Sequence, residues 1–174
     1  MATKKSMWVL FGILVVSAWV LGSVKQAQAE TLNFKAYNYS VKAEIIPVGD
    51  VEGHNLSLGI RRAFNVFENG EVATSIIIVS SDMIKGSGSN IQYNTMTFAD
   101  GSTIVARRAG TVGGTAEKAI TTSDAEGQII KGTGRFQGIK GTLTTKGKFL
   151  PLEKGEVGQK YVGEGTITYT LPPK

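Results

Sequence analysis

Four glycines within ten residues, Gly132, Gly134, Gly138 and Gly141, constrain the fold of this chain more than any other feature. The run GTGRFQGIKG lies between stretches rich in β-branched residues, and neither flank has a helical period. Glycines in such a place mark turns, bulges and points where one backbone passes close to another. The run therefore predicts a tight crossing between two strands, where absent side chains let a sheet close.

From residue 30 onward the chain has the patterning of β-strands. Thr, Val and Ile recur, and no stretch keeps a period of 3.6 residues. Apolar residues alternate from Leu32, and the alternation changes parity before Tyr39, so a bulge or a strand break is expected near residues 37–38. The next strand is expected to turn one apolar face toward the interior. Its members are Leu56, Leu58, Ile60, Phe64 and Val66.

Two dipeptides predict tight hairpin turns, Asn69-Gly70 and Asp100-Gly101. Residues 81–89 (SDMIKGSGS) are expected to form a flexible connection. The whole pattern gives seven to nine strands joined mostly by hairpins, which predicts an all-β fold. The expected architecture is a closed antiparallel β-barrel of about eight strands, with a β-sandwich as the alternative. Closure would also remove the exposed edges of so many strands.

The first 29 residues predict a secretory signal peptide. Lys4 and Lys5 precede an uncharged apolar stretch at residues 7–22, and Ala27-Gln28-Ala29 offers a small-x-small cleavage site. Cleavage after Ala29 would make Glu30 the first residue of a single domain, residues 30–174. The alternative is an uncleaved anchor, although the apolar stretch is shorter than the roughly 20 residues that span a bilayer. The predicted location is therefore periplasmic or secreted.

Charge and composition exclude several function classes. The whole chain carries +5, but loss of Lys4, Lys5 and Lys25 with the signal peptide leaves 16 basic and 14 acidic residues, a net charge of +2. A basic stripe with stacking aromatics is absent, so no nucleic-acid partner is expected. His54 is the only histidine and there is no cysteine, so neither a metal site, nor a cofactor, nor a disulfide is expected. No membrane partner is expected after cleavage.

Candidate ligand-binding residues are Arg62, Arg108 and Tyr93. Arg62 shares parity with the apolar residues of its strand, and Arg108 follows Ile104 and Ala106 on alternate positions. A guanidinium inside a barrel needs a carboxylate, a carbonyl or an anionic ligand beside it. The arginines would then clamp a carboxylate in the lumen. Alternatively, a bulge turns both arginines to solvent, or their aliphatic stems let the charged ends reach the rim of the barrel. In each pair of adjacent arginines, one side chain must point outward. Tyr93 would bind a ligand through its hydroxyl or serve only in packing.

The glycine run resembles the signature of the allene oxide cyclase barrel family, whose relatives include the plant dirigent proteins. The stretch Tyr93–Phe98, followed by Asp100-Gly-Ser and Ile104-Val-Ala, is similar to the central hairpin of that family, and residues 163–169 to its closing strand. The resemblance spans roughly residues 56–171 and implies an eight-stranded barrel, often a homo-oligomer, with an apolar ligand in the lumen. A chain without disulfides fits a bacterial-type exported member.

The cyclases of this family steer an epoxy fatty acid with a glutamate of the first strand and a cysteine. This chain has no cysteine, and Glu44 shares the parity of Ser40 and Lys42, away from the apolar residues. The cyclase reaction is therefore not carried over, and catalytic residues stay unassigned. Two functions are predicted. One is a lumenal binder of a small apolar molecule, with or without cyclisation or isomerisation, and the other is a non-catalytic envelope protein that serves assembly or interaction.

Overall fold

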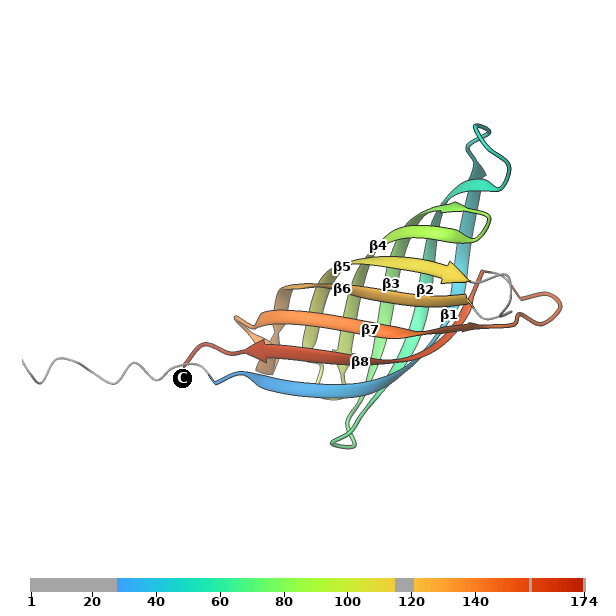
Figure 1. Ribbon diagram of the computed structural model, residues 1–174. Coiled ribbons are helices and arrows are strands. Elements are labelled where there is room, and N and C mark those ends of the chain that lie inside the picture. Colours follow the sequence, from blue (N-terminus) through green and yellow to red (C-terminus); the bar gives the residue numbers. More distant parts are fainter. Residues whose placement is uncertain (1–27, 115–120, 157, 174) are drawn as a thin grey trace, which may run out of the picture.

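The computed structural model describes residues 28–114, 121–156 and 158–173, and these form one closed antiparallel barrel (Figure 1). Eight strands follow one another in chain order, and β1 pairs with β8 to close the sheet. The elements are β1 (Glu30–Pro47), β2 (His54–Phe67), β3 (Val72–Ile84), β4 (Ser87–Phe98), β5 (Thr103–Gly114), β6 (Thr121–Thr133), a 3-10 turn η1 (Gly134–Phe136), β7 (Lys140–Leu150) and β8 (Lys160–Thr170). The predicted eight-stranded barrel is confirmed, and the sandwich alternative is excluded.

The first strand is longer than the barrel wall. β1 pairs with β8 only as far as Tyr39↔Lys160, whereas its ladder with β2 continues to Pro47↔Asn55. The hairpin formed by residues 41–60, called the arm, therefore projects past β8, while β3 pairs with its other side as far as His54↔Ile84 (Figure 1). The predicted irregularity in this strand is a bulge between Ser40 and Lys42, a few residues later than expected.

The apolar face of β2 points outward, which corrects the sequence expectation. Leu58 and Phe64 are half exposed, while Ala63, Asn65 and Phe67 are buried. Strand alternation alone cannot say which face is inside when both faces carry apolar residues. The same reversal places Arg62 outside and its neighbour Arg61 inside.

The two predicted hairpin turns are confirmed, because Gly70 and Gly101 both adopt positive φ in four-residue connections between paired strands. The flexible connection expected at 81–89 is wrong. β3 runs to Ile84 and β4 starts at Ser87, so only Lys85 and Gly86 lie between them, both with positive φ. This is the backbone of a tight hairpin whose twist matches its strands.

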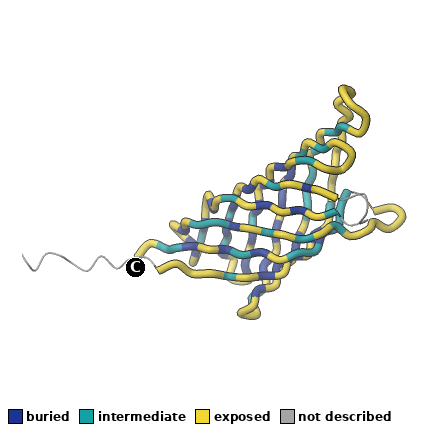
Figure 2. The backbone as a smooth tube through the Cα atoms, viewed as in Figure 1, coloured by how far each residue is buried: buried dark blue, intermediate teal, exposed yellow. Residues whose placement is uncertain are grey.

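The barrel interior has two unlike halves, and Figure 2 shows the buried positions alternating along every strand. The apolar half lies at the end that holds η1, the β2–β3 turn and the β4–β5 turn. Its centre is a chain of rings with neighbouring centroids 4.8 to 6.0 Å apart. The rings are Phe34, Phe67, Phe98, Phe136 and Tyr169. The polar half lies toward the arm and holds Gln92, Asn94, Arg108, Ser123 and Tyr161.

The glycine run forms the connection from β6 through η1 to β7. A Cβ atom at Gly132 would overlap the carbonyl oxygen of Phe136, so only glycine lets η1 fold back against β6. Gly134 starts η1 at φ +61° and is covered by the side chain of Ser102. The run thereby inserts the Phe136 ring into the apolar half.

Most of the predicted signal peptide, residues 1–27, lies outside the described residues. Glu30, the expected first residue after cleavage, is also the first residue of β1. In the part of the chain that the structure covers, no helix is long and apolar enough to cross a membrane.

Candidate anion-binding site in the barrel interior

The structure separates the three predicted ligand-binding residues. Arg108 on β5 points inward and exposes only 3% of its surface, whereas Tyr93 on β4 is 44% exposed on the outer wall. Arg62 is also exposed on the outer wall, and Arg61 takes the interior position instead. Arg61 and Arg108 both line a small cavity in the polar half.

Arg108 is held by neutral groups from two other strands. Its Nη1 donates to Oγ1 of Thr145 at 2.6 Å, and its Nη2 donates to Oε1 of Gln92 at 2.7 Å. Gln92 in turn donates from Nε2 to Oδ1 of Asn90 at 2.7 Å, which fixes its amide. The Nε of Arg108 is buried and has no acceptor among the described residues. One donor of a buried cation that lines the cavity is therefore left without a partner.

Arg61 lies beside Arg108 at the arm end of the cavity. Its Nη2 donates to Oε1 of Gln159, in the loop before β8, and its guanidinium lies 5.7 Å from the ring centre of Phe149. Both contacts are with uncharged groups. The two guanidinium groups also repel each other. Burial is the main cause that lowers the pKa of Arg108, and the charge of Arg61 lowers it further.

Burial is the main electrostatic effect on both arginines. It lowers the pKa of Arg108 and of Arg61 to about 10 in each case, while nearby Tyr161 acts in the opposite direction. Both side chains therefore remain charged at neutral pH. Within the described residues neither has a carboxylate at ion-pair distance. One buried and one partly buried positive charge without a counter-ion are unfavourable unless an anion joins them.

The cavity between these groups has a volume of about 20 Å³. That is enough for about one water, or for one oxygen atom of an anionic group. Asn38 and Asn94 also line it, and the Oδ1 atom of each is buried without a partner among the described residues. Because an amide can rotate by half a turn, either asparagine can offer an N–H donor to an anion.

A much larger hollow of about 1220 Å³ touches seven strands, but it does not mark a single chamber. Its lining includes inward Phe34, Asn90 and Ala125, which expose 3%, 5% and 6% of their surfaces, together with outward Lys146 and Glu164. Little of that volume can therefore lie against interior side chains. The enclosed cavity beside Arg108 is the better candidate site.

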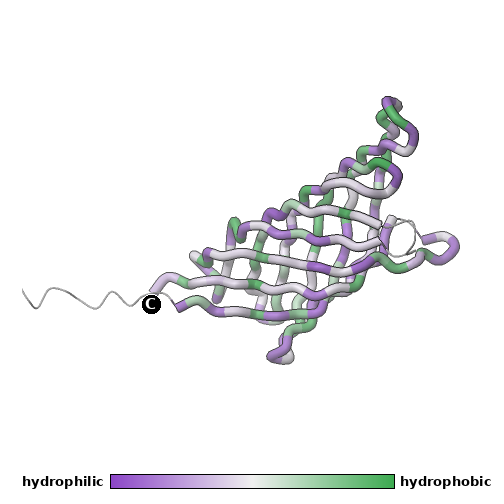
Figure 3. Tube along the Cα trace, viewed as in Figure 1, coloured by the Kyte–Doolittle hydropathy of each residue, from purple (hydrophilic) through white to green (hydrophobic). Residues whose placement is uncertain are grey.

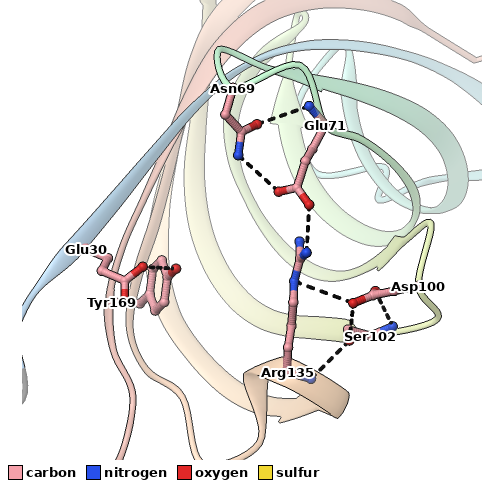
Figure 4. Close-up of polar contacts among 7 residues, drawn as sticks. All are labelled: Glu30, Asn69, Glu71, Asp100, Ser102, Arg135 and Tyr169. Atoms are coloured by element: carbon pink, nitrogen blue, oxygen red, sulfur yellow. Dashed lines mark hydrogen bonds and ion pairs between the residues drawn. The ribbon is translucent and has the colours of Figure 1, made fainter.

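The opposite end of the barrel shows an arginine with its charge balanced (Figure 4). Arg135 of η1 contacts Glu71 through Nη1 at 2.7 Å and Asp100 through Nε at 3.7 Å. Its guanidinium also stacks 4.8 Å from the ring centres of Phe98 and Phe136. The hydrogen bond from Arg135 is the main reason that the pKa of Glu71 lies below its ordinary value. Arg135 therefore closes the apolar half as a structural ion pair.

Two solved structures similar to this chain are of pterocarpan synthase dirigent proteins. PsPTS1 superposes with a TM-score of 0.51 at 17% identity, over 85% of this chain and 99% of that protein. This chain has the dirigent barrel fold. GePTS1 gives a TM-score of 0.48 at 15% identity, over 84% of this chain and 92% of that protein. No family model and no curated protein matches the sequence. Membership of the allene oxide cyclase family and bacterial export stay predictions.

This dirigent-like barrel has one interior residue that the sequence reasoning missed, Arg61. Counting back from Phe67 in steps of two reaches Asn65, Ala63 and Arg61, but the apolar residues of the other parity made the opposite assignment more attractive. Among the described residues no cluster of three metal-ligating side chains exists. His54 instead lies in the arm between two carboxylates. Its Nδ1 is 2.5 Å from Asp50 Oδ1 and its Nε2 is 2.8 Å from Asp82 Oδ1.

Proposed function

We propose that this dirigent-like barrel binds a small, largely apolar molecule that carries a carboxylate or similar anionic group. The observation that supports the proposal is the open Nε donor of Arg108, a buried cation with only neutral partners among the described residues. Arg61 supplies a second positive charge on the same cavity. Together they form the anion clamp predicted from sequence, with Arg61 in place of Arg62.

The cavity admits only an oxygen of the anionic group, so the apolar part of the ligand must lie elsewhere. We place it toward the arm end of the barrel, where Arg61 contacts Phe149 and Gln159. The apolar half is filled by its own rings and offers no comparable space. A barrel that fixes the charged end of a flexible ligand restricts the conformations of that ligand. Such a restriction is what the protein would have to supply for a cyclisation or an isomerisation. The proposed site acts in the exported protein.

The binding test uses octanoate and octanamide, which share one chain length but differ in charge. We expect calorimetric titration to show binding of octanoate and at least tenfold weaker binding of octanamide. The Arg108→Gln variant should lose most of the octanoate affinity, whereas Arg107→Gln, its exposed neighbour on β5, should keep it. Equal binding of both probes, or equal affinity of both variants, would refute an anion site.

An internal counter-ion is the main competing explanation. Glu117 lies outside the described residues, so a Glu117→Gln variant serves as a control. If Glu117 neutralises Arg108, its removal should create octanoate binding that the unmodified protein lacks. The proposal expects octanoate binding in the unmodified protein, with little change in this variant. Mass spectrometry of the extracted host-purified protein should also recover a stoichiometric acidic lipid or aromatic acid.

The second predicted function, a non-catalytic assembly protein, is favoured by a different observation. The outer walls of β1 to β4 expose large apolar side chains, and Figure 3 shows hydrophobic positions continuing into the arm. They include Tyr37, Tyr39, Phe64, Ile76, Ile78 and Tyr93. Exposed apolar surface of this extent is typical of interaction sites. Assembly on the outer wall and ligand binding inside are compatible.

A further inference from the structure

The arm carries a strand edge that forms no backbone ladder with the described residues, although Gly158 lies beside the side chains of Ser40 and Ala43. The β1–β8 ladder ends at Tyr39↔Lys160, and Ser40 donates one further backbone bond to the carbonyl of Gln159 at 2.8 Å. From Lys42 to Pro47, β1 pairs with β2 alone. Closure leaves few free edges in a barrel, and this segment is one of the strand ends that pair on one side only, like the end of β6 after Gln128.

The backbone of this edge has free donors and acceptors at alternate residues. The N–H of Val48 donates to the carbonyl of His54 at 3.1 Å, so the backbone groups of residue 48 face β2. Because the direction alternates along a strand, Ala43 and Ile45 direct their N–H and C=O groups to the free edge. Pro47 has the same parity, and its missing N–H falls on the side where no ladder bond is made. Proline is confined to such edge positions in sheets.

The side chains of this edge alternate between apolar and charged residues. Ala43 and Ile45 share one face, and Ile45 is 63% exposed, while Val41 is the exposed extra residue of the bulge. Lys42 and Glu44 share the other face and are both exposed. Charges on an edge strand normally discourage pairing with other chains. Here the two charges have opposite sign and lie two residues apart, so the edge is complementary to an antiparallel copy of itself.

We propose that two copies of this chain pair along this edge, antiparallel and with Ala43 opposite Ala43 of the second copy. In this register Lys42 lies opposite Glu44 of the second copy, and the two-fold axis repeats that pair. Val41 lies opposite Ile45 of the second copy, and both are apolar. Opposite charges and apolar residues at facing positions each stabilise a sheet.

Other registers and another kind of partner fit less well. Centring the axis on Glu44 would place two carboxylates opposite each other, and centring it on Ile45 would separate Lys42 from Glu44. A membrane surface is a poor partner as well. The arm holds Glu44, Asp50 and Glu52 against one lysine, Lys42, so anionic lipids would repel it.

Single cysteines test the register directly, because the chain has none of its own. In a hydrogen-bonded antiparallel pair the facing Cα atoms are about 5.5 Å apart, which lies within the range of a disulfide. We expect Ala43→Cys to form a disulfide-linked dimer under mild oxidation at least tenfold faster than Glu44→Cys or Ile45→Cys. Thr144→Cys, on the exposed outer face of β7, is the background control. Equal rates at all four positions would overturn the proposal.

Charge exchange tests the facing pair without any crosslink. Sedimentation equilibrium measures the dimer dissociation constant of Lys42→Glu and, separately, of Glu44→Lys. We expect each substitution to weaken dimerisation by on the order of tenfold. Each facing pair of opposite charges contributes about 0.2–1 kcal/mol, and like charges make that contribution unfavourable. The double exchange Lys42→Glu/Glu44→Lys should restore the original dissociation constant within about threefold. A monomer at all accessible concentrations, or a dimer insensitive to these changes, would overturn the proposal. Octanoate binding in the barrel interior is expected to survive in every variant.

Discussion

Two arginines occupy the two ends of the barrel interior under opposite conditions. Arg135 contacts two carboxylates and stacks on two rings, so its charge is balanced by the protein. Arg108 is more deeply buried and contacts only Thr145 and Gln92. The apolar half therefore contributes mainly to stability, whereas the polar half contains a buried positive charge that an external anion can balance.

The largest effect is expected in the apolar half. Phe98→Ala removes the central ring between Phe67 and Phe136 and should lower the free energy of unfolding by about 3–5 kcal/mol. Phe64→Ala, a ring on the outer wall, is the matched control and should cost less than about 1 kcal/mol. Urea denaturation followed by fluorescence measures both. Similar losses in the two variants would show that the apolar half is not the stabilising core.

A smaller and contrasting pair of effects is expected from the two arginines. Arg135→Met should lower the free energy of unfolding by about 1–2 kcal/mol, because packing on the rings and a partly exposed ion pair are lost together. Arg108→Met should change it by less than about 1 kcal/mol in either direction, because relief from burying a charge offsets two lost hydrogen bonds. Thermal denaturation without added ligand measures both. A loss at Arg108 larger than at Arg135 would contradict the comparison.

The Arg135 ion pair also predicts a pH dependence. Arg135 holds the pKa of Glu71 below its ordinary value of 4.5. The stabilisation is therefore complete above that pH and is lost as the pH falls through the lower pKa of the folded state. The difference in melting temperature between the unmodified protein and Arg135→Met should shrink between pH 5 and about pH 3. A constant difference would show that packing, and not the ion pair, is what Arg135 supplies.

The smallest effect is expected at His54 in the arm, outside both halves. Hydrogen bonds to Asp82 and to Asp50 raise its pKa above the ordinary value of 6.5. The stabilisation is therefore complete below pH 6.5 and is lost as the pH rises through the pKa of the folded state. Hydrogen exchange of arm amides should speed up over that rise, relative to the barrel strands. A His54→Asn variant should show no such pH step.

The sequence was sufficient for the fold and insufficient for the orientation of single side chains. The Asn69-Gly70 and Asp100-Gly101 turns and the glycine run are local signals, since each requires a backbone that few residues can adopt. Which face of β2 points inward depends on tertiary packing. Both of its parities contain apolar residues, so Arg62 was named as the candidate for the interior, with an outward position as the alternative, and Arg61 was missed. When two arginines are adjacent in the sequence, the sequence alone does not show which of them points inward.

Arg108 was named as a candidate because it follows Ile104 and Ala106 on alternate positions, although Val105 and Ala109 make the other parity partly apolar as well. Ile104, Ala106 and Arg108 alternate and are all buried, as the sequence indicated. Its neutral partners could not be foreseen, because Thr145 and Gln92 come from strands far apart in sequence. The same holds for the Lys85-Gly86 turn, where residues 81–89 looked flexible but pair across two strands. Non-local pairing, and not local propensity, decides these features.

The most direct test of the account is a crystal structure of the protein with 8-bromooctanoate. The account predicts carboxylate density within hydrogen-bond distance of Arg108 Nε, with the anomalous bromine peak toward the arm end of the barrel. The Arg107→Gln variant should show the same density, and Arg108→Gln should not. A bromine peak only on the outer wall, with Arg108 paired to an acidic side chain of its own chain, would contradict the account.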